Sequence, residues 1–147
     1  MDIPVSTLLR DKGDWVISIA PDATVFQTIS RMVEHNVGAI IVSQAGELMG
    51  IFTERDYLRR IVLQGRTSKT TNVEEVMTRE VICATPDHTV KECMQMMSER
   101  KCRHMPVLRD GKLAGLISMG DCVKHLLATS EQQIETLRGF IQGGYPH

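Results

Sequence analysis

The chain has 147 residues, of which 42% are hydrophobic and 24% charged, with a formal net charge of -1. This composition is globular, and a nearly neutral chain provides no broad field to hold a phosphate backbone or an acidic membrane surface. Aromatic residues make up only 4%, so stacking platforms for single-stranded nucleic acid are scarce. The apolar stretches are far shorter than the roughly 18 to 20 residues that span a bilayer, and residues 1–15 lack a basic head followed by an apolar block. We therefore expect a soluble, cytoplasmic protein that binds neither nucleic acid nor membrane.

An internal repeat organises the sequence. Adding 65 to each number from Ala20 to Ile61 gives Thr85 to Leu126 without any insertion. Eleven of these 42 pairs are identical, against about two or three expected by chance. In the first copy the identical positions are Pro21, Asp22, Thr24, Val25, Met32, Glu34, Val42, Gly46, Leu48, Gly50 and Asp56. The chain is therefore predicted to contain two similar units.

The predicted elements follow the same order in each copy. A short apolar run closed by Pro-Asp, "WVISIAPD" or "EVICATPD", predicts a strand that meets a turn. A helix follows, with a capping-box pair at its start: Thr24 with Gln27 in the first copy and Thr89 with Glu92 in the second.

Two strands and a second helix complete each copy. "GAIIVS" and "HMPVLR" predict strands, which the turns "QAGE" and "RDGK" join to "LMGIFT" and "LAGLIS" as hairpins. After Thr53 and Ser118 the apolar spacing becomes helical. The predicted unit is strand, helix, strand, strand, helix.

The predicted organisation has five parts. A lead-in covers residues 1–15, the first unit 16–64, a polar linker 65–75, the second unit 76–128, and a helix with a tail 129–147. In the last part Ser130 and Gln133 suggest a separate helix cap, and Ile134, Leu137 and Ile141 form a narrow apolar stripe. This stripe either docks on the chain's own core or packs against a second copy of the chain.

The four cysteines, all in the second half, form no Cys-x-x-Cys pair, so a zinc site is not expected. Small reduced core residues are the simpler interpretation, and a reactive thiol is the alternative. The cysteines are Cys83, Cys93, Cys102 and Cys122.

The segments "GIFTERD" (residues 50–56, the first joint) and "GLISMGD" (residues 115–121, the second joint) each predict a strand that runs into a helix. The hydroxyl of Thr53 or Ser118 and the free N–H groups of the helix start would suit an anion. Asp56 and Asp121 fit a helix cap equally well. If instead each carboxylate accepts hydrogen bonds from ribose hydroxyls while the amides face phosphate, the joints suit nucleotides.

The two copies resemble tandem cystathionine β-synthase (CBS) motifs, the Bateman module, over roughly residues 16–127. The resemblance is carried by the doubled Gly-hydrophobic-x-Thr/Ser-x-x-Asp, by "RHMPV" at 103–107 and by "VMTREV". "NVGAIIV", "GIFTERDYLRRIVLQGRTSK" and "VEEVMTREV" are similar to a stand-alone group of bacterial two-motif proteins with relatives in plant organelles.

The resemblance implies an α+β fold in which two β-α-β-β-α motifs pack by their sheets about a pseudo-twofold axis. It also implies two clefts for adenine nucleotides or related adenosyl compounds, such as AMP, ATP or NAD(H). The resemblance further implies that the bound state is passed to a partner protein or domain, and that pairs of chains often associate into disc-like dimers, here a homodimer.

The resemblance also implies binding residues. Asp56 and Asp121 would bind ribose hydroxyls, and Thr53 and Ser118 would face ribose or phosphate. The cleft of Asp121 would include Ser18 and, from "RHMPV", Arg103, His104, Met105 and Pro106. The cleft of Asp56 would include Thr78, Val81, Ile82 and Cys83.

Three cations near the first joint would suit a phosphate, and we add them from the sequence itself: Arg55, Arg66 and Lys69. Arg55 could instead be a solvated charge, and His104 a half-exposed residue at a strand edge. "GAIIV" in the first copy lacks the basic pair and the proline of "RHMPV", which puts the first cleft in doubt.

The sequence predicts no enzyme, because familiar phosphate-loop, dinucleotide and metalloprotease motifs are absent. Acid and base catalysts need unlike environments, whereas the repeat puts Asp56 and Asp121 in equivalent, separate sites. We expect a regulatory nucleotide-binding module with no catalytic residue and no metal. A structural or oligomerisation module without a physiological ligand is the alternative.

Overall fold

The structure is a computed structural model that describes residues 3–13 and 16–142, with side chains described as far as Ser130. The first unit contains β1 (Ser18–Ile19), α2 (Val25–Glu34), β2 (Ala39–Gln44), β3 (Glu47–Thr53), α3 (Glu54–Tyr57) and a π-helical turn, η1 (Leu58–Val62). The second contains α4 (Val90–Arg100), β4 (His104–Arg109), β5 (Lys112–Ser118) and α5 (Met119–Gln142). Two further elements precede the units: α1 (Val5–Lys12) and the 3₁₀ turn η2 (Val73–Glu75).

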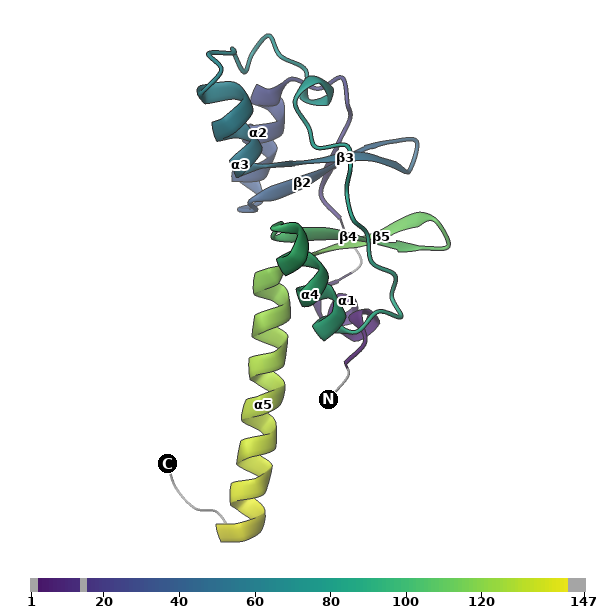
Figure 1. Ribbon diagram of the computed structural model, residues 1–147, viewed down its shortest axis with the longest axis vertical. Helices are drawn as coiled ribbons and strands as arrows, with labels where there is room; N and C mark the ends of the chain where they lie inside the picture. Colours follow the sequence, from purple (N-terminus) through teal and green to yellow (C-terminus); the bar gives the residue numbers. More distant parts are fainter. Residues whose placement is uncertain (1–2, 14–15, 143–147) are drawn as a thin grey trace.

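The predicted α+β fold is confirmed, with two small sheets related by the repeat. In the first sheet β1 pairs parallel with β2, and β2 pairs antiparallel with β3; in the second β4 pairs antiparallel with β5. Figure 1 shows the two hairpins side by side at the centre, with α2 and α3 above them and α4 and α5 below. Contacts between β3 and β5 join the two units.

Local sequence explains the hairpins and helix starts. Each hairpin turns on two residues with positive φ, Ala45 and Gly46 or Asp110 and Gly111, as a two-residue turn between twisted strands requires. The predicted capping boxes are present at α2, with Thr24 and Gln27, and at α4, with Thr89 and Glu92. In each, the threonine hydroxyl accepts a hydrogen bond from the third N–H of the helix, and the Gln27 or Glu92 side chain accepts one from the threonine N–H. The two predicted hairpins and the two predicted capping boxes are confirmed.

The predicted first strand of the second unit is wrong, because among the described residues only Ala84 pairs there, as an isolated bridge with Val107. In the first unit the parallel pairing includes a hydrogen bond from Ile41 N–H to the Ile17 carbonyl, 3.3 Å. Position 65 residues after Ile41 is Pro106, which has no N–H to donate. Pro106, which belongs to the "RHMPV" segment, therefore cannot form the hydrogen bond that would pair the predicted first strand of the second unit with β4.

The predicted separate C-terminal helix is also wrong. Residues 119–142 form one continuous helix, α5, and Ser130 lies inside it rather than at a cap. No proline or glycine lies between Asp121 and Arg138, so nothing in the sequence forces a break, and serine is tolerated within a helix. In Figure 1 α5 extends well beyond the two hairpins. The apolar stripe of Ile134, Leu137 and Ile141 lies outside the residues whose side chains are described.

The segments that precede the two units are exchanged between the cores. α1, which lies in the predicted lead-in, buries Val5, Leu8 and Leu9 in the core of the second unit. Conversely, η2 and the residues after it bury Val73 and Val76 in the core of the first unit. Each unit is therefore completed by the chain that leads into the other unit.

The four cysteines are reduced, as predicted: Cys93 and Cys122 are buried, and Cys83 and Cys102 are partly buried. Burial raises the pKa of Cys93 to about 12 and that of Cys122 to about 11. In the part of the chain that the structure describes, no helix is long and apolar enough to cross a membrane. No cluster of three potential metal-binding side chains occurs there either.

Candidate functional site

At the first joint, Thr53 ends β3 and is the N-cap of α3. Thr53 and Asp56 form a capping box there. The Asp56 N–H donates to Thr53 Oγ1 at 3.1 Å, and the Thr53 N–H donates to Asp56 Oδ2 at 3.0 Å. The Thr78 hydroxyl lies 3.2 Å from Oδ1 and 3.4 Å from Oδ2 of Asp56. Asp56 is only 8% exposed, so this carboxylate is enclosed by the chain itself.

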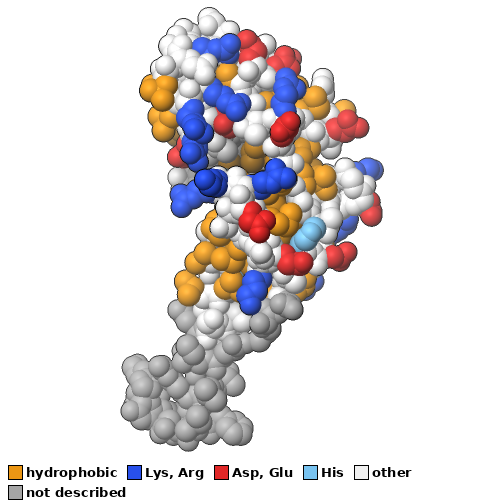
Figure 2. All heavy atoms as spheres, viewed as in Figure 1, with side chains coloured by type: hydrophobic (Ala, Val, Ile, Leu, Met, Phe, Trp, Pro, Cys, Tyr) orange, Lys and Arg blue, Asp and Glu red, His pale blue; other side chains and the backbone are white. Residues whose placement is uncertain are grey.

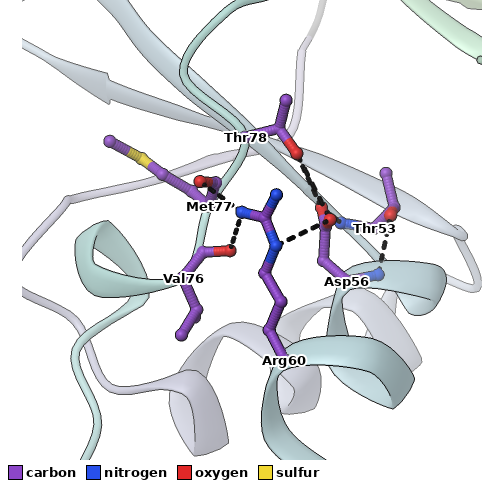
Figure 3. Close-up of polar contacts among 6 residues, drawn as sticks. All are labelled: Thr53, Asp56, Arg60, Val76, Met77 and Thr78. Carbon is purple, nitrogen blue, oxygen red and sulfur yellow. Dashed lines mark hydrogen bonds and ion pairs between the residues drawn. The ribbon is translucent and has the colours of Figure 1, made fainter.

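Arg60 closes the first joint further. Its Nε lies 3.9 Å from Asp56 Oδ1, while one terminal nitrogen donates to the carbonyls of Val76 and Met77 at 2.9 Å each. Figure 3 shows Arg60 between the carboxylate and these carbonyls, with Thr78 above the carboxylate and Thr53 on the side away from Arg60. Both oxygens of Asp56 therefore have donors within the protein.

The second joint repeats the cap but leaves the carboxylate more open. The Asp121 N–H donates to Ser118 Oγ at 3.0 Å, and the Ser118 N–H donates to Asp121 Oδ2 at 2.9 Å. Lys12 Nζ, at the end of α1, donates to the same Oδ2 at 2.6 Å and to the Leu116 carbonyl at 2.7 Å. Asp121 Oδ1 has no hydrogen bond to any of the described residues.

A cavity of about 320 Å³ opens at the second joint. Its polar lining includes Ser118, Asp121, His104 and Lys12. The rest of the lining comes from α1, the chain before β1, the loop before β2, and β5: Leu9, Gly13, Val16, Ile17, Asn36, Val37, Gly38, Ala39, Gly115 and Leu116. Both units thus contribute to one concave, mainly apolar site with a few polar groups at one end, which is how small-molecule sites are usually built.

The repeat explains why the second joint is open. Lys12 and Gly13 lie 65 positions before Met77 and Thr78. Lys12 and Gly13 lie beside the second joint, and Met77 and Thr78 lie beside the first. The Thr78 side chain fills the space beside Asp56, whereas Gly13 has no side chain to fill the space near Asp121. Gly13 also has φ of 103°, a conformation that favours glycine.

The charges of the second joint are coupled. Burial alone would raise the pKa of Asp121, but hydrogen bonds from Lys12 and Ser118 outweigh it and lower that pKa below its ordinary value. Burial lowers the pKa of His104, as do the charges of Lys12 and Arg103, against the opposite effects of Asp121 and Glu54. Both shifts favour a carboxylate at Asp121 and a neutral imidazole at His104 in this site.

The structure brings only some of the predicted binding residues to this cavity. His104, Ser118 and Asp121 line it; Ser18 is replaced there by its neighbours Val16 and Ile17. Arg103 is exposed outside the lining, and Met105 and Pro106 are buried in β4.

At the first joint, the Thr78 hydroxyl contacts Asp56. Val81, Ile82 and Cys83 are half-buried and have no hydrogen bond or ion pair to Asp56.

The three cations added from the sequence have other surroundings. Lys69 Nζ lies 5.1 Å from the centre of the Phe26 ring, Arg66 pairs with Glu75 at 4.0 Å, and Arg55 is exposed on α3. Sequence analysis missed Lys12 and Arg60 instead. Extending the repeat backwards from Ala20 would have aligned Lys12 and Gly13 with Met77 and Thr78, and this alignment was the available signal.

Comparison with known proteins gives one consistent result. The family model of the CBS domain matches this chain twice, at residues 16–63 and 73–128. The mitochondrial CBS domain-containing protein CBSX3 of Arabidopsis thaliana is 40% identical over 151 residues, which cover 96% of this chain and 73% of that protein.

Solved structures agree with the fold. The crystal structure of the CBS domain NE2398 has a TM-score of 0.83 and 41% identity, covering 86% of this chain and 99% of the other. The CBS domain protein PAE2072 of Pyrobaculum aerophilum, solved as a complex with AMP, has a TM-score of 0.73 and 23% identity, covering 81% and 89%. Two family matches in one chain and a repeat of 65 residues agree. The chain belongs to the CBS-domain family and carries two CBS domains in tandem.

Proposed function

We propose that this protein is a regulatory module that binds an adenine nucleotide at the second joint and signals its presence to a partner protein. The observation that carries this proposal is the cavity of about 320 Å³ in which Asp121 presents a carboxylate oxygen that no described residue hydrogen-bonds, beside the Ser118 cap and Lys12. Its volume lies in the range of small-molecule sites. The AMP complex of a CBS domain protein with the same fold supports the ligand class.

The lining of the cavity suits the two ends of such a ligand. The side chains of Ile17, Val37 and Leu116 offer an apolar surface for a purine ring. Asp121 Oδ1 would accept hydrogen bonds from the ribose hydroxyls, and the helix start behind Ser118 favours negative charge. The lining thus offers both an apolar surface for a base and polar groups for a sugar phosphate within one site.

The signal follows from the position of the cavity between the units. Its lining comes from α1, from the chain before β1, from the residues that lead into β2, and from both strands of the second hairpin. A ligand that contacts all of these segments stabilises the arrangement in which they surround the cavity, relative to any arrangement in which the units or α1 have moved apart. Binding would thus change the surface that a partner protein meets, and the module needs no catalysis of its own.

We also propose a homodimer through the helical face of the two units. The apolar side chains exposed there are Phe26, Val33, Leu58, Val62, Leu63, Val123 and Leu127. Leu58 and Val62 lie 65 residues before Val123 and Leu127, so the two units expose the same two positions. Figure 2 shows hydrophobic side chains along this side of the molecule, over α2 and α3 and over the start of α5.

A groove on the same face supports this interface. Between α2 and α3 lies a mainly apolar pocket of about 210 Å³, bordered by the exposed side chains of Val33 and Leu58. Exposed apolar surface of this kind marks interaction sites, and a repeated surface suits a twofold partner.

A structural module without a ligand is the second candidate, and the first joint favours it. There both oxygens of Asp56 are occupied by Thr53, Thr78 and Arg60, so this joint acts as a helix cap. We therefore propose one nucleotide per chain, at the second joint. The location in the cytoplasm stays a prediction, and the name of the Arabidopsis relative places that protein in the mitochondrion.

A thermal-shift titration tests the proposal. The protein is titrated with AMP, ADP, ATP, NAD, NADH and S-adenosylmethionine, and so are the Asp121→Ala and Asp56→Ala variants. A ligand at a hundredfold excess over Kd is expected to raise Tm by about 5–10 °C. Asp121→Ala should abolish this rise, whereas Asp56→Ala should lower the starting Tm and keep the rise. The proposal fails if no compound raises the Tm of the natural sequence, or if Asp121→Ala responds in full.

A further inference from the structure

Lys12 is the only lysine or arginine among the described residues that line the cavity. Of the cations predicted to bind phosphate, Lys69 lies over Phe26, Arg66 pairs with Glu75, and Arg55 and Arg103 are exposed outside the lining. If the proposed nucleotide site is correct, on which this inference rests, the positive charge that its phosphate meets in the cavity belongs to α1.

The hydrogen bonds of Lys12 leave it able to take one more acceptor. A lysine ammonium group has three N–H donors, and within the described structure Lys12 uses two of them, on Asp121 Oδ2 and on the Leu116 carbonyl. The ammonium group is held in place by the chain, and its side chain is still 42% exposed. It can therefore donate to a phosphate oxygen without giving up the ion pair.

Asp121 has the complementary pattern. Its Oδ2 already accepts two hydrogen bonds, from the Ser118 N–H and from Lys12 Nζ, while Oδ1 accepts none from the described residues. Among the described residues, a donor of Lys12 and an acceptor of Asp121 thus stay without a partner in one ion pair whose atoms are 2.6 Å apart. A ligand that carries hydroxyl groups and a phosphate close together matches both.

The other joint shows what this arrangement adds. In place of Lys12 and Gly13 it has Met77 and Thr78, and the Thr78 hydroxyl supplies a neutral donor to Asp56. The cation that closes that joint, Arg60, is bound to two backbone carbonyls and lies near the carboxylate. Among the ion pairs of the described residues, only the carboxylate of the second joint is paired with an ammonium group.

We propose that Lys12 is the specificity-determining residue of the second joint, selecting adenosine compounds that carry a phosphate over those that do not. The ligand class is then an adenosine phosphate, and S-adenosylmethionine, which has no phosphate, is disfavoured. Because Lys12 lies on α1, the N-terminal helix takes part directly in ligand recognition.

Calorimetric titrations of AMP and of adenosine into the natural sequence, Lys12→Met and Lys12→Arg test this role. Lys112→Met, at an exposed lysine at the start of β5 and outside the cavity, is the matched control. A charged hydrogen bond predicts that Lys12→Met weakens AMP binding by about 10- to 100-fold and leaves adenosine within about threefold. Lys12→Arg should keep part of the preference for AMP, and Lys112→Met all of it.

The ratio of the two affinities separates recognition from a structural effect. If Lys12→Met weakens AMP and adenosine equally, Lys12 only holds the fold, and the inference is wrong while the nucleotide site stands. An unchanged AMP affinity, or a gain for both ligands because a blocking side chain is gone, also overturns it.

A third probe keeps the inference apart from the proposed function. If the natural sequence binds neither AMP nor adenosine, and none of the other titrated compounds raises its Tm, the proposed function fails. Thermal shifts with inorganic pyrophosphate then decide the role of Lys12. A rise in Tm in the natural sequence that Lys12→Met loses supports an anion site at Lys12, and no rise overturns it.

Discussion

Asp56 and Asp121, which occupy equivalent repeat positions, differ in burial and in the number of hydrogen bonds they accept from the protein. Asp56 is enclosed: it accepts hydrogen bonds from Thr53 and Thr78 and lies near Arg60. The Asp121 side chain is 30% exposed and forms an ion pair with the partly exposed Lys12. The same residue type at the same repeat position is thus mainly structural in one unit and available in the other.

Alanine substitutions should separate these roles. We expect Asp56→Ala to lower the free energy of unfolding by about 2–3 kcal/mol, because a cap is lost and the Thr78 hydroxyl and Arg60 lose their acceptor. Asp121→Ala should cost only about 1 kcal/mol, since the cap is lost but Lys12 is exposed enough to be solvated. Urea unfolding measures both, and equal losses would contradict the distinction.

His104 should give the protein a measurable pH dependence. Because its pKa is lowered in the folded state, the unfolded chain takes up the proton first as the pH falls. The neutral imidazole therefore contributes its full stability above the unfolded pKa of about 6.5, and this contribution declines as the pH falls toward the folded pKa.

We expect the free energy of unfolding to fall more between pH 7 and pH 5 in the natural sequence than in His104→Gln. Urea titrations at intervals of half a pH unit measure the two slopes. Parallel slopes would show that His104 does not experience the burial described here.

Close backbone packing at two glycines holds the exchanged elements against the sheets. A Cβ at Gly50 would lie 2.7 Å from the Thr78 carbonyl oxygen and 2.8 Å from Met77 Sδ, whereas one at Gly115 would lie 2.5 Å from Cδ2 of Leu9. The Thr78 backbone is fixed, because it exchanges two hydrogen bonds of 2.9 Å with Ile51. The end of a leucine side chain can rotate away more easily.

Gly50→Ala should therefore destabilise the protein by about 2–3 kcal/mol and Gly115→Ala by about 1 kcal/mol, measured by urea unfolding. Gly120→Ala is the control: its Cβ would meet only Ser118 Oγ, at 3.6 Å, inside a helix, and should stabilise by about 0.5 kcal/mol. If Gly115→Ala proves the costlier of the two, α1 is held more rigidly than the Thr78 segment.

At the scale of the whole molecule, the exposed apolar face predicts self-association. Leu58 is 56% and Val123 39% exposed at equivalent positions of the two units, on the face with the apolar groove between α2 and α3. Burying such side chains against a second copy would remove them from water.

The double variant Leu58→Glu with Val123→Glu should therefore be a folded monomer, since two charges in a dry interface cost far more than they do in water. Light scattering after size exclusion measures the mass, with Lys112→Glu at the exposed start of β5 as control. A natural sequence that elutes as a monomer at all concentrations would rule this interface out.

Much of the fold is determined by sequence over short distances. The capping boxes at Thr24 and Thr89, the two hairpin turns and the two joints each depend on a few neighbouring residues, and the offset of 65 residues shows that they occur twice. Local hydrogen bonds and backbone preferences decide such features, so the sequence alone predicts them. The family follows from the same short motifs.

Only the tertiary structure decides which joint is open. Lys12 meets Asp121 across 109 positions of sequence, and α1 and η2 exchange places between the two cores. Nothing local to the second joint indicates that a glycine and a lysine from the start of the chain lie beside it, while a threonine hydroxyl fills the first. A site shared by segments so far apart is set by how the two units pack, because packing brings together side chains that no short pattern connects.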